Sequence, residues 1–183
     1  MSKIKEFAVP TFVLTLICLI SAFLLGMTNE ITAPKIAEIS AENEKKARQV
    51  VFESAASFGE TTEKDGISLT PALDENGATI GYVVVTVEKG YGGDIEVMTG
   101  VDTDGKVTGV DILSHSETAG LGANADKVTF RDLFKGKTAG VTVSKDAPGE
   151  NSIDALTGAT ITSRAVTKAV NAAIQAAGGE NIG

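Results

Sequence analysis

The sequence has one cysteine, one histidine and no tryptophan, and aromatic residues make up only 5% of its 183 positions. A lone cysteine cannot form a disulfide within the chain, and a lone histidine excludes a multi-histidine zinc site. A Ser-His-Asp hydrolase would have to use that histidine, His115, but the sequence contains no G-x-S-x-G motif. The composition therefore argues against disulfide-stabilised domains, metal centres built from cysteine or several histidines, and α/β-hydrolases.

Positive charge is also scarce. The 16 lysine and arginine residues are outnumbered by 24 aspartate and glutamate residues, which leaves a net charge of -8. A chain this acidic, with no basic cluster, is a poor partner for nucleic-acid phosphates, so we expect it to bind no nucleic acid. Hydrophobic residues make up 43% of the chain and charged residues 22%, which is typical of a folded protein. The length fits one ordinary domain with an appendage.

Charge is absent altogether from residues 7–29, a stretch rich in Leu, Ile, Val and Phe. About 20 helical residues, rising about 1.5 Å each, cross a hydrocarbon core of about 30 Å, so the stretch predicts a membrane-spanning helix. Lys3 and Lys5 precede it and Glu30 follows it, which favours a cytoplasmic N-terminus with the rest of the chain outside. We therefore expect a single-pass anchor over residues 1–29 in the cell (inner) membrane, in contact with the lipid bilayer.

Two alternatives for this segment are a cleaved signal peptide and a lipoprotein. The segment Gly26–Thr28 does not resemble the A-x-A exit of a signal peptide, and the apolar run is longer than a signal-peptide core. Leu16 and Ile17 are larger than the residues that precede a lipoprotein cysteine, so Cys18 is expected to be an apolar residue of the helix. An uncleaved anchor is favoured.

The rest of the chain predicts a stalk helix and one domain. Pro34 suits the first position of a helix, and a partial apolar stripe runs from there to Phe52. The stripe consists of Ile36, Ile39, Ala47 and Val50. Residues 57–66 are polar and predict a loop. The expected divisions are an anchor over 1–29, a stalk over 30–56 and a domain over 57–183.

The domain begins with β-type sequence. Three segments rich in β-branched residues predict strands: 78–87, 94–101 and 106–113. Asp74–Gly77 is a turn before the first strand, and Asp102–Gly105 is a hairpin connection between the last two. The second turn is similar to the start of an EF-hand, but Leu113 stands where the final glutamate should be, so we expect no calcium site.

Helical patterns follow the strands. Lys127–Phe134 predicts a short helix with the apolar set Val128, Phe130, Leu133 and Phe134. Val141–Val143 predicts a short strand, and Ser152–Thr162 a turn of small residues. Ser163–Ala177 predicts a helix that ends at Gly178 and Gly179, with one apolar face made of Val166, Val170, Ala173, Ile174 and Ala177. Because helices and strands do not alternate strictly, the predicted fold class is α+β, with an antiparallel sheet and flanking helices.

The most distinctive segment is Asp154–Arg164, with the sequence DALTGATITSR. From the residues alone it is the start of a helix, because Thr and Ser cap helices and Gly lets the chain turn. Its pattern D-x-x-T-G-A-T also resembles the target of the enzyme that joins FMN, through its phosphate, to a threonine hydroxyl. In that family the last threonine bears the flavin, which corresponds to Thr160. A phosphate there would lie beside a helix N-terminus, where free N–H groups and the helix dipole favour an anion.

Two earlier segments extend this resemblance, Gly90–Ile95 (GYGGDI) and His115–Gly122 (HSETAGLG). Together with the anchor, nearly the whole chain resembles the G subunit of the Rnf complex, a membrane-bound ferredoxin:NAD oxidoreductase coupled to ion transport. That family usually has Glu-Thr-Pro-Gly-Leu-Gly in the second segment, where Ala119 replaces the proline. The C subunit of the sodium-pumping NADH:quinone reductase shares the motif but is usually longer.

The His115–Gly122 segment has other interpretations. Gly120–Ala125 imitates the dinucleotide pattern G-x-G-x-x-A, but polar residues separate it from the preceding strand, which argues against a Rossmann site. An ordinary surface loop stays open. In the resembling family this loop lies near the flavin, and for His115 a structural hydrogen bond is favoured over proton transfer. Three weaker candidates are left out of the predicted site: Lys89, Tyr91 and Asp94.

The resemblance implies a site for covalent FMN, with no catalytic residue and no metal. The flavin phosphate would be joined to Thr160. The other residues implied for the cofactor site are Asp154, Thr157, Gly158, Ala159, Thr162, Ser163, Glu117, Thr118, Leu121 and Gly122.

The resemblance also implies a function, which is electron transfer through FMN in a non-autonomous redox subunit of a translocating oxidoreductase. Its partners would be other membrane and peripheral subunits of an Rnf-type complex, with a flavin transferase for maturation. The FMN domain would lie on the extracytoplasmic side. Two other functions stay open: a membrane-tethered scaffold without a cofactor, and a flavin subunit of a complex like the sodium-pumping NADH:quinone reductase.

Overall fold

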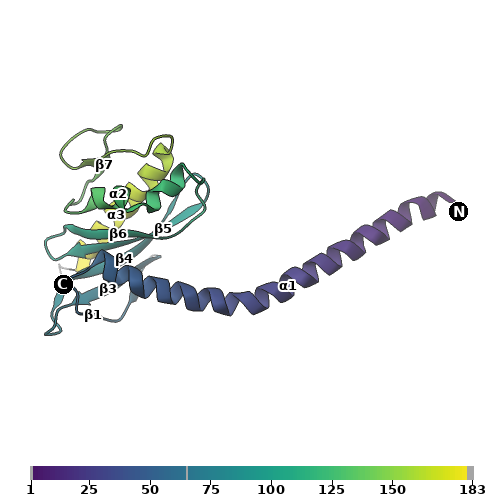
Figure 1. The fold of residues 1–183 in the computed structure, drawn as a ribbon, viewed down its shortest axis with the longest axis horizontal. Coiled ribbons are helices and arrows are strands. Elements are labelled where there is room, and N and C mark those ends of the chain that lie inside the picture. The colour runs from purple at the N-terminus through teal and green to yellow at the C-terminus, as the bar shows by residue number, and fades with distance from the viewer. Residues whose placement is uncertain (1, 65, 181–183) are drawn as a thin grey trace. The chain divides into compact units, whose positions relative to one another are not determined.

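A computed structural model describes residues 2–64 and 66–180 (Figure 1). The chain divides into two compact units, Met1–Asn43 and Glu44–Gly183. The elements are α1 (Ser2–Val51), β1 (Ser57–Phe58), β2 (Thr62–Lys64), β3 (Ile67–Leu73), β4 (Thr79–Lys89), β5 (Asp94–Asp102), β6 (Val107–His115), η1 (Gly122–Asp126), α2 (Val128–Arg131), η2 (Asp132–Phe134), β7 (Thr142–Val143), β8 (Ser152–Ile153) and α3 (Thr160–Glu180).

The first unit is helical throughout its described residues, because α1 runs without interruption from Ser2 to Val51. This helix is long and apolar enough to cross a membrane, and its large side chains, such as Phe12 and Leu19, are exposed. The helix of the stalk was expected to start at Pro34. Instead Pro34 lies inside α1. A proline there removes one backbone donor, and the helix continues through it because good helix formers flank it.

The second unit is built on an antiparallel sheet of six strands. The strand order is β1-β3-β4-β5-β6, and β2 pairs with β3 beside β1. Each turn expected between strands is present, at Asp74–Gly77 and at Asp102–Gly105. In both turns the aspartate Oδ1 accepts two backbone N–H bonds, and the glycine adopts a positive φ. The α+β class with an antiparallel sheet is confirmed.

Strand β3 lies in a segment where no strand was expected, and β1 and β2 lie in the predicted loop at 57–66. Pro71 obscures β3, because a proline cannot donate to a sheet ladder. Its carbonyl nevertheless accepts the N–H of Gly59, and its register partner on β4 is Tyr82. The proline therefore occupies a strand position at which its acceptor is used and its missing donor is tolerated.

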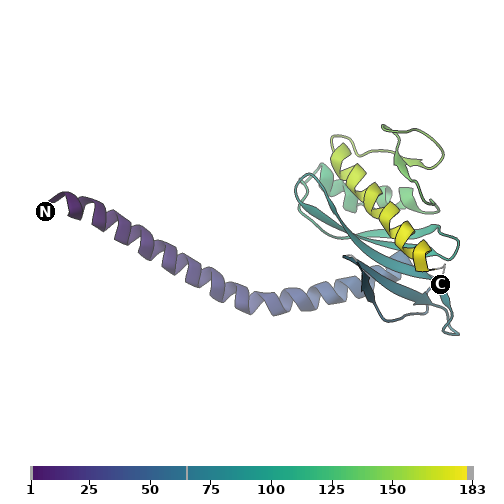
Figure 2. The same cartoon turned by 180° about the vertical axis from the view of Figure 1, so that it is seen from behind.

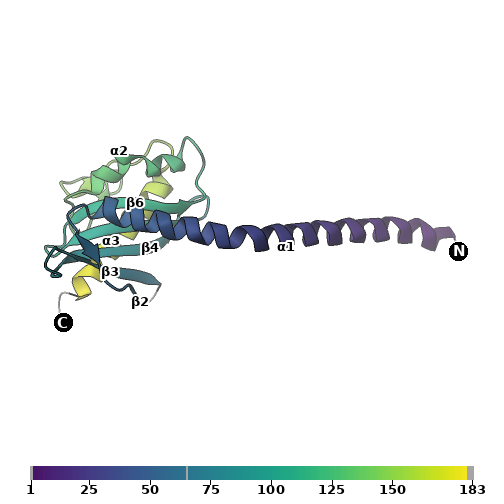
Figure 3. The same cartoon turned by 60° about the horizontal axis from the view of Figure 1, so that its bottom comes forward.

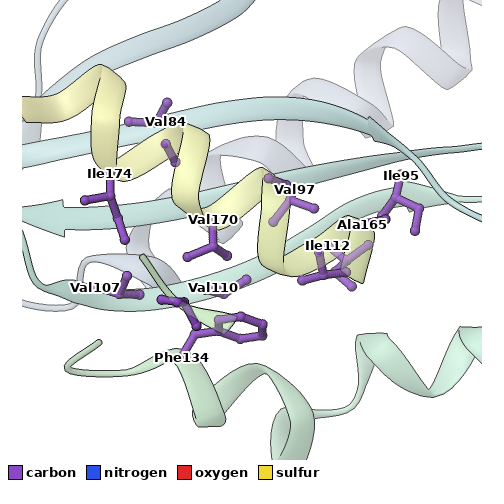
Figure 4. Close-up of a cluster of buried hydrophobic side chains, with 14 of the residues drawn as sticks. Val84, Ile95, Val97, Val107, Val110, Ile112, Phe134, Ala165, Val170 and Ile174 are labelled. Carbon is purple, nitrogen blue, oxygen red and sulfur yellow. The ribbon is translucent and has the colours of Figure 1, made fainter. Parts of the chain in front are cut away.

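One face of the sheet is covered by α3, as the view from behind shows (Figure 2). All five residues expected on the apolar face of this helix are buried: Val166, Val170, Ala173, Ile174 and Ala177. They pack on strand residues such as Val84 and Val97, and Phe134 closes the same cluster (Figure 4). In the short-helix segment, α2 and η2 bury Phe130 and Phe134 in an edge-to-face pair, whereas Val128 and Leu133 are exposed.

The opposite face of the sheet packs against residues 44–51 of α1 (Figure 3). Successive residues of a strand point to opposite faces of a sheet. Val83 and Met98 therefore point to this face, whereas their neighbours Val84 and Val97 point to the face that α3 covers. Within the expected stripe Ala47 is buried, but Val50 is exposed and its neighbour Val51 is buried instead. The prediction of the apolar stripe was therefore wrong by one residue at its end.

The end of α1 sits on a pair of glycines. Gly100 of β5 and Gly109 of β6 face each other in the sheet, and Val51 lies directly over them. The hydroxyl of Thr108 donates to the Val51 carbonyl at 2.6 Å. A Cβ added at Gly109 would lie 2.8 Å from the Val51 Cα, so this close approach requires glycine.

The start of α3 differs from the prediction. The segment Ser152–Thr162 was expected to be a turn, but it contains β8, which pairs in parallel with β7, and the first residues of α3. The helix begins at Thr160 rather than at Ser163. Ser163 accounts for the early start, because its hydroxyl accepts the N–H of Leu156 and donates to the Ala159 carbonyl, both at 3.0 Å.

The glycine pair generates a testable prediction. Gly109→Ala should lower the free energy of unfolding by about 1–3 kcal/mol, because the added methyl group overlaps the backbone of Val51. Gly149→Ala is the matched control, because a Cβ there would have no heavy atom within 4 Å. Urea denaturation of the full chain in detergent, followed by circular dichroism, measures both. Equal stability of the two variants would contradict the proposed packing of α1 on the sheet.

Candidate functional site

A cavity of about 450 Å³ lies in the second unit, where four segments meet. Tyr91 comes from the β4–β5 turn, a second group follows β6, a third leads into the first turn of α3, and Lys145 comes from the loop after β7. The lining residues are Tyr91, Glu117, Thr118, Leu121, Gly122, Lys145, Gly158, Ala159, Thr160, Ile161 and Thr162. The volume falls in the range of about 300–1,000 Å³ that is usual for small-molecule sites.

The carboxylate of Glu117, in the loop after β6, joins this loop to the β4–β5 turn and to α3. Its Oε1 accepts the backbone N–H groups of Tyr91 at 2.8 Å and Gly92 at 2.9 Å. Its Oε2 accepts the hydroxyl of Thr162 at 2.5 Å. Segments more than 20 residues apart in sequence are therefore held together by one side chain.

Glycines let the backbone approach this carboxylate. A Cβ at Gly122 would overlap Glu117 Oε2 and lie 2.7 Å from Thr162 Oγ1. A Cβ at Gly90 would overlap Glu117 Oε1 and lie 2.6 Å from the Cδ1 of Ile95. Neither position accepts a side chain without displacing Glu117. The close approach to Glu117 thus explains the glycines in the segments 90–93 and 120–122 without dinucleotide binding.

Thr160 is the first residue of α3 and lines the cavity. The first i to i-4 hydrogen bond at this end runs from Ser163 N–H to the Ala159 carbonyl. The N–H groups that precede it, from Thr160 to Thr162, are the ones that a helix leaves without partners inside itself, and they sit at the positive end of the helix dipole. The hydroxyl of Thr160 therefore stands where a negatively charged group is favoured.

The loop after β7 adds a cation to the cavity. Lys145 Nζ donates to Thr160 Oγ1 at 3.3 Å. On one side of it, the Ser144 hydroxyl donates to Asp154 at 2.8 Å. On the other side, Arg164 binds Asp146 through two nitrogen atoms. This exposed ion pair favours the charged forms, and hydrogen bonding from Arg164 lowers the pKa of the Asp146 carboxyl from its ordinary value.

The structure brings most of the predicted site residues together. Eight of them line the cavity: Glu117, Thr118, Leu121, Gly122, Gly158, Ala159, Thr160 and Thr162. Asp154, Thr157 and Ser163 are not among the lining residues. Asp154 is bonded to Ser144, Thr157 is exposed, and Ser163 is fully buried with its hydroxyl engaged in the turn before α3. A cofactor contact for these three stays a prediction.

Three lining residues were not predicted. Tyr91 had been set aside as a weaker candidate, although its place in the GYGG turn is a usable signal. Ile161 and Lys145 were not predicted either; Ile161 directly follows the D-x-x-T-G-A-T motif, whereas Lys145 has no local signal. The two other weaker candidates, Lys89 and Asp94, form an exposed ion pair at 3.2 Å and are not among the lining residues.

His115 has the structural hydrogen bond expected for it. Its Nδ1 accepts the backbone N–H of Glu117 at 3.2 Å, which orients the start of the loop. Ala119, where proline was the expected residue, is exposed, and the loop around it closes with Leu121 N–H and Ala123 N–H donating to the Thr118 carbonyl. The loop therefore forms without the proline.

The chain is similar to known proteins over the region that contains this cavity. The sequence pattern of the FMN-binding domain family matches residues 90–175, which include all the residues that line the cavity. The chain is 42% identical to the G subunit of the proton-translocating ferredoxin:NAD(+) oxidoreductase complex of Clostridium ljungdahlii, over 88% of this chain and 86% of that protein. It is 38% identical to the G subunit of the Na(+)-translocating complex of Acetobacterium woodii, over 89% and 87%.

A solved structure shares the fold. The crystal structure of the C subunit of the Na(+)-translocating NADH-quinone reductase from Parabacteroides distasonis superposes with a TM-score of 0.55 and 22% sequence identity, over 75% of this chain and 91% of that one.

The electrostatics of Glu117 generate a prediction. Burial raises the pKa of this carboxyl, but the hydrogen bonds from Thr162, Gly92 and Tyr91, with an electrostatic contribution from His115, lower it by more, so the pKa lies below its ordinary value of 4.5. A carboxyl with a lowered pKa in the folded state stabilises the fold above pH 4.5, and this stabilisation is lost as the pH falls through the lowered pKa. Glu117→Gln should therefore cost about 1–2 kcal/mol of unfolding free energy at about pH 7 and less at about pH 3.

Urea denaturation at the two pH values measures this difference. Glu75→Gln, at an exposed position of the Asp74–Gly77 turn, makes the same chemical change outside the cavity and should have little effect at either pH. A Glu117→Gln variant that is as stable as the wild type at neutral pH would show that the carboxylate does not hold the three segments together.

Proposed function

The chain belongs to the family of G subunits of ion-translocating ferredoxin:NAD(+) oxidoreductase complexes, and we propose that it is a membrane-anchored electron-transfer subunit that binds FMN. The observation that supports this most directly is the position of Thr160. The threonine expected to bear the flavin begins α3, lines the cavity and contacts a lysine. The subunit would pass electrons between other redox carriers of the complex.

The cavity fits a flavin mononucleotide. The N-terminus of α3 and Lys145 offer donors and positive charge to a phosphate. Tyr91, Leu121 and Ile161 are exposed by 73%, 45% and 50%, and offer apolar surface to a ring system. When bound, FMN supplies the electron-transfer chemistry, and the chain supplies binding, orientation and restriction of solvent.

We propose that the attachment is covalent, as the resemblance implies. The Thr160 hydroxyl would lose its proton as its oxygen forms a bond to the flavin phosphate, and a flavin transferase would supply the activated phosphate and its leaving group. The small neighbours Gly158 and Ala159 leave this hydroxyl accessible, and Thr160 itself is partly exposed. Gly158 turns the chain with a φ of +75°, which brings the motif up to the helix start.

The two other functions that the sequence allows have different requirements. A scaffold without a cofactor has no need of a cavity lined by the motif itself, so the geometry favours a flavin protein. Membership of a sodium-pumping NADH:quinone reductase is less well supported, because the relatives that match most of this chain at 38–42% identity are ferredoxin:NAD(+) oxidoreductase subunits. Other subunits of such a complex are the expected partners.

Orientation in the membrane is also proposed. The lysines before the apolar stretch favour a cytoplasmic N-terminus, which would leave the second unit on the extracytoplasmic side. An apolar helix without charges between residues 7 and 29 offers no path for an ion, so ion movement would belong to partner subunits.

The covalent link predicts a mass change. Chain purified from a membrane that contains the flavin transferase should gain the mass of FMN less one water, on the peptide that contains Thr160. Thr160→Ala should lose the increment completely, whereas Thr160→Ser, which keeps a hydroxyl, should retain some of it. Mass spectrometry with peptide mapping measures all three.

The control for this experiment is Thr129→Ala, which removes an exposed threonine away from the cavity and should be modified like the wild type. An unmodified wild-type chain would overturn the covalent link. If that chain also bound no free FMN, the scaffold function would be the better account.

The orientation predicts labelling from outside. In a Cys18→Ala background, Ala78→Cys places a thiol at an exposed position of the second unit. A membrane-impermeant maleimide should label it in intact cells to the same extent as after lysis. Labelling only after lysis would place the second unit in the cytoplasm and reverse the proposed topology.

A further inference from the structure

Lys145 is distinguished by its position. Among the described residues that line the cavity it is the single cationic side chain, and Glu117 is the single acidic one. Its ammonium group lies 3.3 Å from the Thr160 hydroxyl, although the two residues are 15 positions apart in the chain. An exposed lysine usually moves freely in solvent, so a directed contact of this kind requires that its backbone be held in place.

The backbone on both sides of Lys145 is held. Ser144 directly follows β7, and its N–H donates to the Ile153 carbonyl at 2.8 Å while its hydroxyl donates to Asp154. Asp146 is bound by two nitrogen atoms of Arg164, which projects from the first turns of α3. The loop is thus fastened to the same helix that begins with Thr160, and Lys145 lies between the two fastening points.

The charges in the cavity show what this cation can do. A phosphate esterified both to the Thr160 oxygen and to the alcohol of the flavin has one negative charge. This phosphate would share the cavity with the Glu117 carboxylate. Like charges in one partly enclosed site oppose each other, and a cation at the shared oxygen offsets that repulsion. The same cation favours loss of the hydroxyl proton, because it stabilises negative charge on the oxygen.

We propose that Lys145 is the phosphate-positioning residue of this protein, fixed by the Ser144–Asp154 and Asp146–Arg164 contacts so that its ammonium group binds the phosphate attached to Thr160. This inference rests on the proposed attachment of FMN at Thr160. It assigns a role to a residue outside the D-x-x-T-G-A-T motif, so the motif alone is not the complete attachment site.

The test is the rate at which FMN appears on Thr160. Full-length chains are expressed together with the flavin transferase, samples are taken at intervals, and mass spectrometry gives the modified fraction of the Thr160 peptide. Lys145→Gln should slow the modification about tenfold, the size expected for the loss of one charge-assisted hydrogen bond at a partly exposed site. Lys145→Arg, which keeps the charge, should remain close to the wild type.

Two further measurements separate this role from a merely structural one. Lys127→Gln makes the same charge change at an exposed position that does not line the cavity, and should be modified at the wild-type rate. Binding of free FMN to unmodified Thr160→Ala chain should weaken when Lys145→Gln is added, and the difference should shrink in about 1 M salt, which screens charges beyond about 3 Å.

Each outcome bears on the proposal. Modification of Lys145→Gln at the wild-type rate would overturn the role of Lys145 and leave the proposed function intact. Equally slow modification of Lys145→Arg would show that shape rather than charge matters, and would also overturn it. A wild-type chain without FMN on Thr160 would overturn both proposals together. Asp146→Asn, which weakens the Arg164 contact but keeps Lys145, should slow the modification by a smaller factor.

Discussion

The site depends on the three hydrogen bonds that the Glu117 carboxylate accepts. Among the hydrogen bonds of the described residues, Glu117 alone joins the β4–β5 turn, the loop after β6 and the first turn of α3, because it lies in the loop and accepts donors from both of the other segments. The glycines at 90 and 122 exist in this arrangement because a side chain at either would occupy the space of the carboxylate. The glycines near Glu117 therefore let its carboxylate hold the three segments together. The cavity lies between the segments that are held in this way.

The sheet connects this junction to the last turns of α1. Strands β5 and β6 bear Gly100 and Gly109, on which Val51 rests, and the same strands lead to the turn and loop that Glu117 joins. The opposite face of the sheet holds α3, whose first residue is Thr160. The last turns of α1 and the proposed cofactor site are therefore mounted on one antiparallel scaffold. A fixed position suits an electron carrier, because its distance to its redox partners must be reproducible.

Local patterns predicted much of this architecture. The strands 79–89, 94–102 and 107–115, their two Asx turns and the apolar face of α3 follow from short-range periodicity, and the expected segments differ from the observed ones by a few residues. Strand β3 was not predicted because Pro71 breaks the usual pattern. The start of α3 was placed too late because the Ser163 hydroxyl binds the backbone of the turn before the helix, which the local pattern does not reveal. Both errors come from single side chains whose effect is visible only in three dimensions.

The residues of the candidate site also include some that the local sequence predicted and some that it did not. Residues inside the two recognised segments were predicted because they are contiguous, and eight of them line the cavity. Lys145 was not predicted, because the sequence around it is that of a polar loop and does not distinguish it from other surface lysines. Its significance arises from two contacts of its neighbours, one to Asp154 after β8 and one to Arg164 of α3, that turn a solvent-exposed side chain toward one hydroxyl. In the proposed attachment, the motif gives the residue to be modified, and the fold places a cation beside its hydroxyl.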